Sequence, residues 1–489
     1  MLFNSIEFLF FFPIVTILYF LLPHKYRWFH LLISSCIFYC AFIPAYILIL
    51  FFTIIIDYFA GIFIENTKDK KKKYFLVLSL IANISVLAVF KYYNFFIDNI
   101  NSLLHTFNIT THTLPLLNII LPIGLSFHTF QAMSYTIEVY RGNQKAEKHF
   151  GIYALYVMFY PQLVAGPIER PQNVIYQFRI KHQFDYDRVV SGLRLMAWGL
   201  FKKVTIADRL SILVNNIYDN PAQNSGLPII VATFFFAIQI YCDFSGYSDI
   251  ALGSARVMGF NLMKNFDRPY FSKNISEFWN RWHISLSSWF RDYVYISLGG
   301  NRVVKWRWYF NLFFVFMLSG LWHGANWTFI VWGALHGIYL IVENVTKSNM
   351  EDFSKKTSLI KFPMLQKIIN TIITFLLVSF AWIFFRAKSF NDAITLINNS
   401  ILETKSYYEG SIHYGLNSIK VFYTKLDWIF ILISLSILLI VHWIQRNKSP
   451  NLLISKQNIY IRWIMYFGMI ILLLFERQMG KSQFIYFQF

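Results

Sequence analysis

Long apolar stretches separated by short polar ones make up almost the whole chain. A helix needs about 20 apolar residues to cross a bilayer, and somewhat fewer where helices break inside a bundle. By this measure the pattern predicts roughly eleven to thirteen membrane passes and an all-α, polytopic fold. The candidate segments are residues 5–22, 29–43, 45–63, 75–97, 115–137, 151–167, 190–207, 226–242, 307–323, 327–345, 367–385, 427–445 and 459–475.

Two regions interrupt this pattern of apolar spans. The segment at 115–137 contains Pro122 and Gly124, which break a helix, and we expect it to be re-entrant rather than spanning. Residues 261–307 interleave charged side chains with Phe, Trp and Tyr, which is typical of helices that lie at the membrane interface or fold back into a protein-lined cavity. Because no internal repeat or Gly/Ser linker separates the segments, we expect one integral-membrane domain over residues 1–489.

Composition supports the membrane assignment. Hydrophobic residues make up 56% of the chain and charged residues 14%, against about 25% charged in an ordinary globular domain. A soluble fold cannot bury that much apolar surface, so most of the chain must be solvated by lipid. We therefore expect the lipid bilayer itself to be a partner of this protein.

The charge balance predicts an orientation. The chain has 44 Lys and Arg against 25 Asp and Glu, a net charge of +19. No basic stretch is long enough to form a docking face for nucleic acid, whereas basic residues of membrane proteins gather in cytoplasmic loops. Basic clusters at residues 24–27 and 68–73 flank two spans, so both are expected in the cytoplasm. This places the N-terminus outside.

The sharpest candidate for chemistry is the sequence LWHGANW at residues 321–327, at the junction of two apolar segments. Ionisable groups at membrane depth are costly and often mark a pathway or a reaction centre. An imidazole titrates near neutrality, so His323 can accept a proton from a hydroxyl and return it. The flanking Trp rings can wall a tunnel, and Gly324 leaves room for a ligand. A structural histidine bonded to a neighbouring helix is the alternative.

A second candidate lies in the sequence FWNRWHISLS at residues 278–287. Read as one helix, this block has an aromatic face that includes Trp282, and Glu277 pairs with Arg281 one turn later. His283 is then buried beside the aromatic face, where a structural and a functional role are both open.

His336 is a third candidate, and its sequence surroundings favour a structural role. No carboxylate or cysteine falls at a ligand spacing beside any of these histidines. The three cysteines lie in apolar surroundings, and none has the Cys/His spacing typical of zinc. No metal site is therefore expected.

Several further blocks follow one another in a fixed order between residues 120 and 390. They are PIGLSF (122–127) with YTIEVYRG (135–142), PQLVAGPIER (161–170), WGLFKK (198–203) with IADR (206–209), YCDFSGYSD (241–249), FWNRWHISLS (278–287), RDYVYISLGG (291–300), LWHGANW (321–327) and WIFFRA (382–387). On these blocks the chain resembles the membrane-bound O-acyltransferase (MBOAT) family, in particular its bacterial alginate O-acetylase-like branch. The first and last hundred residues match that family mainly in hydropathy.

This resemblance implies a ring of membrane helices around a funnel or tunnel that crosses a thinned region of membrane. It implies transfer of an acyl group from a thioester donor to a hydroxyl, with His323 at the family's catalytic position and His283 at its second polar position. The donor is expected to be acyl-CoA, with acetyl-CoA preferred, or an acyl-carrier thioester, and no cofactor is expected to be bound. The expected location is the bacterial inner membrane.

The resemblance also implies a partner protein. In this branch, an extracytoplasmic acyltransferase or esterase-like partner is thought to complete the transfer of the acetyl group to a polysaccharide. The expected function is therefore O-acetylation of a cell-surface or exported polysaccharide, in cooperation with such a partner.

The chemistry of acyl transfer assigns further roles. A hydroxyl is a poor nucleophile until a base takes its proton, which is the role expected of His323. The oxyanion that develops needs a hydrogen-bond donor, for which Asn326 and Asn280 are candidates, although ordinary polar contacts are the simpler reading of both. We assign Trp322 and Trp282 to the substrate site.

Other polar residues are expected to be structural. Cys242 or Ser245 could in principle carry a covalent acyl group, but no histidine is adjacent to them and Gly246 suggests a helix break. Ion-paired anchors at the tunnel mouths are the expected role of Arg141, Arg170, Asp208, Arg291, Asp292 and Arg386.

Two other functions compete with this one. The first is D-alanyl transfer to teichoic acid, which belongs to the same family and takes its acyl group from a carrier protein. The blocks at 161–170 and 241–249 resemble the acetylase branch more closely. The second is a secondary transporter with intramembrane His and Asp coupling sites. Transporters usually carry repeated halves with broken helices at matching positions, and the sequence shows no such repeat.

Overall fold

A computed structural model of the chain contains helices and no strand among the residues that it describes, which confirms the all-α prediction. The described residues are 1–68, 70–109, 113–164, 166–356, 361–402, 419, 422–446, 450–474 and 484–485. Contacts divide the chain into two compact units. The first contains Met1–Ala197 and Tyr247–Met263, and the second contains Trp198–Gly246 and Lys264–Ile485.

Six helices in the described part of the chain are long and apolar enough to cross a membrane, and two shorter apolar helices, Ile6–Leu21 and Ile459–Leu474, accompany them. The six are Pro44–Asn66, Lys70–Thr106, Leu227–Met258, Trp327–Ser348, Pro363–Arg386 and Lys425–Ile444. Each of them overlaps a predicted pass, although Lys70–Thr106 and Leu227–Met258 extend well beyond the predicted 75–97 and 226–242, and every other predicted pass also contains helical residues. The protein is therefore a multi-pass membrane protein.

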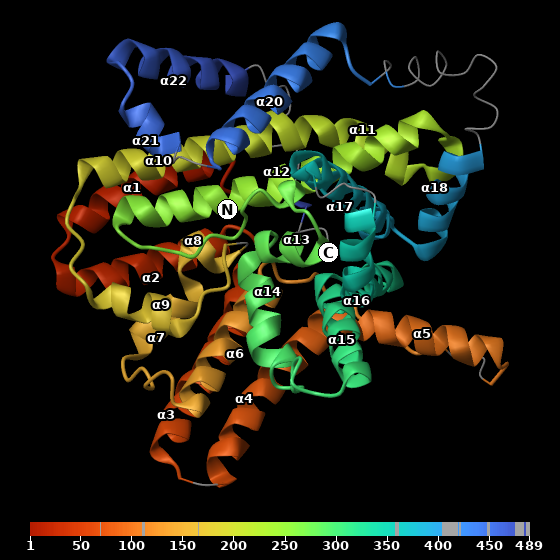
Figure 1. Cartoon of the computed structure of the whole chain (residues 1–489). Coiled ribbons are helices and arrows are strands. Elements are labelled where there is room, and N and C mark those ends of the chain that lie inside the picture. Colours follow the sequence, from red (N-terminus) through yellow and green to blue (C-terminus); the bar gives the residue numbers. More distant parts are fainter. Residues whose placement is uncertain are drawn as a thin grey trace. The chain divides into compact units, whose positions relative to one another are not determined.

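The first unit is a set of helices in which α3, α4 and α6 pack side by side (Figure 1). Its elements are α1 (Ile6–Leu21), α2 (His24–Cys40), η1 (Pro44–Tyr46), α3 (Ile47–Asn66), α4 (Lys70–Leu87), η2 (Ala88–Tyr92), α5 (Tyr93–Thr106), α6 (Leu125–Arg141), α7 (Phe150–Met158), α8 (Tyr160–Leu163), α9 (Pro171–Val174), η3 (Ile175–Arg179), most of α10 (Tyr186–Leu200) and the last part of α12 (Leu227–Met258).

A polar cluster joins α3, α4 and α6 inside this apolar unit. Asp57 on α3 is fully buried, and Ser79 Oγ on α4 donates a hydrogen bond of 2.6 Å to its carboxylate. Asn83 Nδ2 lies 2.9 Å from each carboxylate oxygen, and Ser79 Oγ lies 3.1 Å from Thr136 Oγ1 on α6. Polar side chains that bond across helices hold them in register, because a buried polar group without a partner is costly.

Two predicted boundaries differ from the structure. The helix expected over 115–137 begins only at Leu125, because Gly124 has a left-handed conformation with φ of 77°. A Cβ on Gly124 would lie 2.8 Å from the carbonyl oxygen of Leu163, so the close approach of that chain also requires glycine. The lysines at 70–73, expected in a loop, form the first turn of α4 instead.

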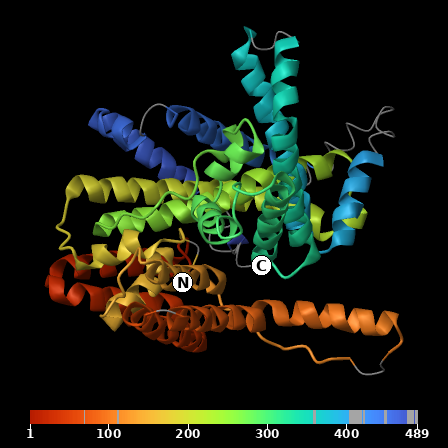
Figure 2. The same ribbon diagram turned by 60° about the horizontal axis from the view of Figure 1, so that its bottom comes forward.

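The second unit contains the histidines of interest. Its elements are η4 (Phe201–Ala207), α11 (Asp208–Asp219), η5 (Pro221–Gln223), the first part of α12, η6 (Pro269–Phe271), α13 (Ile275–Arg281), α14 (Ile284–Phe290), η7 (Arg291–Tyr295), α15 (Lys305–His323), α16 (Trp327–Lys356), α17 (Pro363–Arg386), α18 (Phe390–Leu402), α20 (Lys425–Ile444), α21 (Pro450–Ser455) and α22 (Ile459–Leu474). Figure 2 shows α16 and α17 as neighbouring helices, in agreement with their contacts.

Helices α15 and α16 cross backbone to backbone because glycines lie at their contact. A Cβ on Gly320 would collide with the carbonyl oxygen of Phe329, and a Cβ on Gly333 would collide with a carbonyl oxygen of α15. Both glycines belong to Gly-x-x-x-Gly sequences, at residues 320–324 and 333–337. This spacing of small residues is the one that lets membrane helices approach closely.

A buried ion cluster holds the start of α11 against α12. Lys203 Nζ lies 2.7 Å from Asp208 Oδ1 and 2.8 Å from Asp243 Oδ1, and all three side chains are almost fully buried. The backbone N–H of Ile485 donates a 2.7 Å hydrogen bond to the other oxygen of Asp243. Asp208 is therefore ion-paired, as expected from the sequence. Buried charges are tolerated only when they are paired and hydrogen-bonded in this way.

The contact between α15 and α16 generates the first prediction. Gly333→Ala should lower the unfolding temperature of the detergent-purified protein, because a methyl group forced into a packed contact costs about 1–3 kcal/mol. Gly468→Ala on α22 is the matched control, since nothing lies within 4 Å of a Cβ added there. Thermal unfolding followed by size-exclusion chromatography measures both variants. Equal unfolding temperatures would contradict the close crossing.

Candidate functional site

His323 is the last residue of α15, and α16 begins at Trp327. Its side chain is buried, with 4% of the residue exposed. The imidazole stands edge-on to the rings of Trp322, Trp332 and Phe385, whose centroids lie 4.9, 5.0 and 5.3 Å away. The end of α15 therefore places an imidazole inside an aromatic wall, at the junction expected from the sequence.

The expectation that Gly324 leaves room for a ligand is wrong. A Cβ on Gly324 would collide with the ring of Phe329, which fills the space beside it. The Phe329 ring packs in turn on Phe385 at 5.0 Å. The glycine therefore serves the packing of α16 against the end of α15.

His283 lies between α13 and α14, so the single helix expected over 278–287 is two short helices. The break occurs because His283 has a left-handed backbone, with φ of 43° and ψ of 56°. The backbone N–H of Ile284 donates to the carbonyl oxygen of Asn265 at 2.9 Å and leaves the helical ladder. The expected pair between Glu277 and Arg281 is present at 2.6 Å.

The structure brings His283 and His323 together around one indole ring. The ring of Trp322 is 6.2 Å from that of His283 and 4.9 Å from that of His323. Phe244 and Phe266 cover His283 at 4.7 and 6.3 Å, and the side chain is fully buried. This burial lowers the pKa of His283 to about 3, so its imidazole is neutral at physiological pH.

His336 belongs to the same cluster, which the sequence did not indicate. The ring of Trp332 lies 5.0 Å from His323 and 5.1 Å from His336. The indole N–H of Trp279 donates to His336 Nδ1 at 3.3 Å. Trp332 Nε1 and His336 Nε2 are buried and have no hydrogen-bond partner among the described residues. Their spacing of four residues on α16, which places both on one face, was the available signal.

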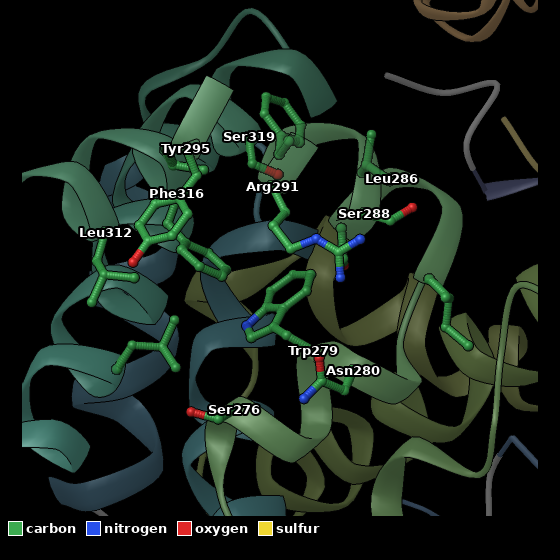
Figure 3. A pocket seen from close by; sticks show the side chains of 15 residues that line it. Ser276, Trp279, Asn280, Leu286, Ser288, Arg291, Tyr295, Leu312, Phe316 and Ser319 are labelled. Atoms are coloured by element: carbon green, nitrogen blue, oxygen red, sulfur yellow. The ribbon is translucent and has the colours of Figure 1, made fainter. Parts of the chain in front are cut away.

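A cavity of about 300 Å³ opens beside this cluster. Trp279, Asn280, Arg291 and Ser319 are among the residues that line it (Figure 3). His323 and His283 are not in its lining, but Ser319 precedes His323 by one turn of α15 and shares its face. The cavity therefore lies along the side of α15 that carries His323. Trp279 lines the cavity and also donates the hydrogen bond to His336.

Arg291 lines this cavity, and Glu343 bonds Ser276, which also lines it. In Figure 3 the Arg291 side chain reaches across the cavity toward Trp279, while its Nε bonds Asp292 at 2.8 Å. Glu343 on α16 accepts hydrogen bonds from Ile275 N and Ser276 Oγ at 2.9 and 2.7 Å. Its carboxylate caps the first turn of α13, where the unpaired N–H groups favour negative charge. The sequence analysis missed Glu343.

The remaining predicted site residues have varied surroundings. Asn326 Nδ2 donates to the carbonyl oxygen of Lys388 at 2.9 Å, and its Oδ1 accepts from Thr328 N at 3.0 Å. Asn280 is exposed at the cavity wall.

The two predicted Trp residues differ in their contacts. Trp282 is buried and packs on the Trp382 ring at 5.1 Å rather than on His283. Of the two predicted Trp residues, Trp322 lies next to both histidines.

The residues expected to be structural have structural contacts. Ser245 Oγ accepts a 2.8 Å hydrogen bond from Lys202, and Cys242 is fully buried. Three of the arginines expected to be anchors form ion pairs, which are Arg141 with Glu138, Arg291 with Asp292, and Arg386 with Asp219. No group of three His, Cys, Asp or Glu side chains that could hold a metal ion occurs in the described part of the chain.

Comparison with known proteins places these features in a family. A model of the membrane-bound O-acyltransferase family matches residues 148–384, which include His283, His323 and His336. The protein named "Probable alginate O-acetylase AlgI" of Pseudomonas aeruginosa is 38% identical over 398 residues, covering 80% of this chain and 73% of that protein.

Two further relatives are named for other acyl transfers. The "Peptidoglycan O-acetyltransferase" of Helicobacter pylori is 36% identical over 436 residues, covering 82% of this chain and 80% of that protein. The "Teichoic acid D-alanyltransferase" of Bacillus subtilis is 29% identical over 291 residues, covering 56% of this chain and 71% of that protein.

Proposed function

The chain belongs to the membrane-bound O-acyltransferase family, as its sequence blocks predicted, and from that membership we propose that it O-acetylates a cell-surface polysaccharide. It takes an acetyl group from a cytoplasmic thioester and passes it to a hydroxyl at the outer face. The observation that carries this proposal is the meeting of His283 and His323 around the Trp322 ring. Two segments that are distant in sequence contribute imidazoles to one buried cluster. A catalytic site gives a reason to bury such groups together, whereas solvation by lipid gives none.

His323 is the base in this proposal. The hydroxyl oxygen attacks the thioester carbonyl while its proton passes to the imidazole, and the same proton then leaves with the thiolate as the carbon–sulfur bond breaks. The ester is the product, and the thiol is released. The bond between carbon and sulfur is already activated, so the chain needs to supply only a proton carrier, an oriented hydroxyl and stabilisation of the oxyanion.

The low pKa of His283 supports this division of roles. A base works best when its pKa lies near the operating pH, and an imidazole whose pKa is about 3 is a weak proton acceptor at neutral pH. His283 instead accepts a hydrogen bond from the bound substrate and orients it. The reactive hydroxyl has one proton, which passes to His323, so His283 bonds a different donor group of the substrate.

The cavity beside the cluster is the proposed route for the thioester arm. Arg291 reaches into it and carries a charge that suits the phosphates of coenzyme A or of a phosphopantetheine carrier. Asn280 in the cavity wall remains a candidate donor to the oxyanion. Asn326 is a weaker candidate, because its amide already bonds Lys388 and Thr328.

Acetyl is favoured over D-alanyl because the O-acetylases match a larger share of this chain than the D-alanyltransferase does. Mass spectrometry of esters released from cell-surface polymers distinguishes the two groups by mass. If the polymers instead carry a D-alanyl ester that depends on this protein, the result would contradict acetyl transfer and support D-alanyl transfer.

The second prediction concerns the base. His323→Ala should lower kcat by roughly 10²–10⁴-fold while the protein still inserts and folds, because the change removes one side chain from a wall of aromatic rings. His105→Ala is the matched control, since His105 is exposed on α5. Released acetyl esters are measured in cells that lack the native protein and contain equal membrane amounts of each variant. Normal ester levels with His323→Ala would refute the assignment.

The protein is proposed to lie in the bacterial inner membrane with its N-terminus outside. The basic residues at the start of α4 support this orientation, since they favour the cytoplasmic side. The third prediction is that a cysteine at Lys71, in a cysteine-free background, resists an impermeant thiol reagent in intact cells, whereas one at Asn4 reacts. Labelling at position 71 together with protection at position 4 would show that the orientation is the opposite one.

A partner protein is proposed to finish the transfer to the polymer. The two units of this chain consist of packed helices in their described parts, and neither shows a separate domain of the about 100–150 residues that could hold a long polysaccharide. A distant sugar hydroxyl must be positioned against the thioester before it reacts, which needs a further surface.

Reconstitution provides the fourth prediction. Purified protein in liposomes, with acetyl thioester on the cytoplasmic side and polysaccharide on the other, should acetylate the polymer slowly unless a secreted or membrane-anchored acyltransferase is added. The same liposomes with His323→Ala protein give the background rate. Fast polymer acetylation without any second protein would show that the partner is unnecessary.

A further inference from the structure

We propose that Asn265 is a positioning residue that holds His283 in one tautomer. In that tautomer the imidazole carries its proton on Nδ1 and presents the lone pair of Nε2. The assignment deepens the proposed function, because it makes His283 a hydrogen-bond acceptor toward the substrate, but its geometry stands without that function. Asn265 itself is almost fully buried.

The orientation of the Asn265 amide follows from its contacts. The backbone N–H of Ser285 lies 3.2 Å from one amide atom, and Ser285 Oγ lies 3.0 Å from the same atom. A backbone N–H can only donate, so the atom that it meets must be the amide oxygen and cannot be the NH₂ group. The usual ambiguity between the oxygen and nitrogen of an asparagine is thereby removed at this site.

The amide oxygen then decides the tautomer of His283. His283 Nδ1 lies 3.1 Å from Asn265 Oδ1, and an amide oxygen can only accept. Nδ1 must therefore carry the proton. Because burial keeps the pKa of His283 at about 3, the imidazole has one proton at neutral pH, and the lone pair lies on Nε2.

Asn265 also fixes the position of the ring. Its backbone oxygen accepts from Ile284 N at 2.9 Å, so both ends of the residue bind the turn that carries His283. That turn is strained, because a side chain with a Cβ disfavours a φ of 43°. The rings of Phe244 and Phe266 stand at 4.7 and 6.3 Å and present carbon surfaces to the imidazole.

His336 shows the opposite arrangement and makes the assignment specific. The indole N–H of Trp279 can only donate, so His336 Nδ1 is an acceptor and the proton of a neutral imidazole lies on Nε2. The Nε2 atom of His283 is thus an acceptor, whereas the Nε2 atom of His336 is a donor. If the two histidines exchanged tautomers, both of these hydrogen bonds would be lost, the one between His283 Nδ1 and Asn265 and the one between Trp279 and His336 Nδ1.

Solid-state NMR of ¹⁵N-histidine-labelled protein in liposomes tests the proposal. A proton bound to an imidazole nitrogen shifts its resonance strongly, so each tautomer has its own pair of signals. A His283→Gln sample, which lacks one pair, identifies the signals of His283. We expect Nδ1 protonated and Nε2 unprotonated at pH 7 in the native protein without substrate. Protonated Nε2 of His283 in the native protein would overturn the proposal.

Two substitutions at Asn265 complete the experiment. Asn265→Leu removes the acceptor oxygen and should give Nε2–H or a mixture of tautomers, with kcat at least about tenfold lower. Asn265→Asp keeps an acceptor oxygen and should retain Nδ1–H and more activity than the leucine variant. Asn344→Leu on α16 is the matched control, because its amide bonds only the carbonyl oxygen of Leu340 among the recorded contacts, and should leave the His283 signals unchanged.

The outcomes separate this proposal from the proposed function. An unchanged His283 tautomer in Asn265→Leu would refute the role of Asn265, whatever reaction the protein performs. The expected tautomers with no acyl transfer in any sample would refute the function and leave the positioning role supported.

Discussion

The chemistry of the second unit depends on the backbone contact between α15 and α16. Glycines at positions 320 and 333 let the two helices touch where any Cβ would collide with a carbonyl oxygen. Only at that separation does Trp332 on α16 reach the His323 ring at the end of α15. A wider crossing would move the aromatic wall away from the imidazole and admit water. Small residues that serve helix association therefore also set the environment of the proposed base.

That aromatic wall has a consequence for every polar atom within it. In a medium of low dielectric constant a hydrogen bond is stronger and a missing partner more costly, so the position of each proton matters. His283 is neutral because it is fully buried, and a water-poor site protects a thioester from hydrolysis. In the proposed reaction, the same rings of Trp322 and Trp332 would hold the imidazoles in place and keep water, the competing nucleophile, away from the thioester.

The sequence predicted the class of fold and the position of His323 well, because both depend on local patterns. Apolar runs of membrane length indicate helices directly, and His323 stands where one run ends. The break at His283 was missed because it depends on Asn265, which is distant along the chain and binds through its backbone as well as its amide. The place of His336 beside the other two histidines was missed for a similar reason, since only the fold brings Trp279 to its ring.

The order of contacts through the cluster gives the proposed site a direction. His283 touches Trp322, which touches His323, which touches Trp332, which touches His336. An acceptor nitrogen lies at one end of this row and a donor nitrogen at the other, with the proposed base in the middle. In the proposed reaction, an acceptor nitrogen suits the hydrogens of an entering substrate group, and a donor nitrogen suits a thioester carbonyl that becomes an oxyanion.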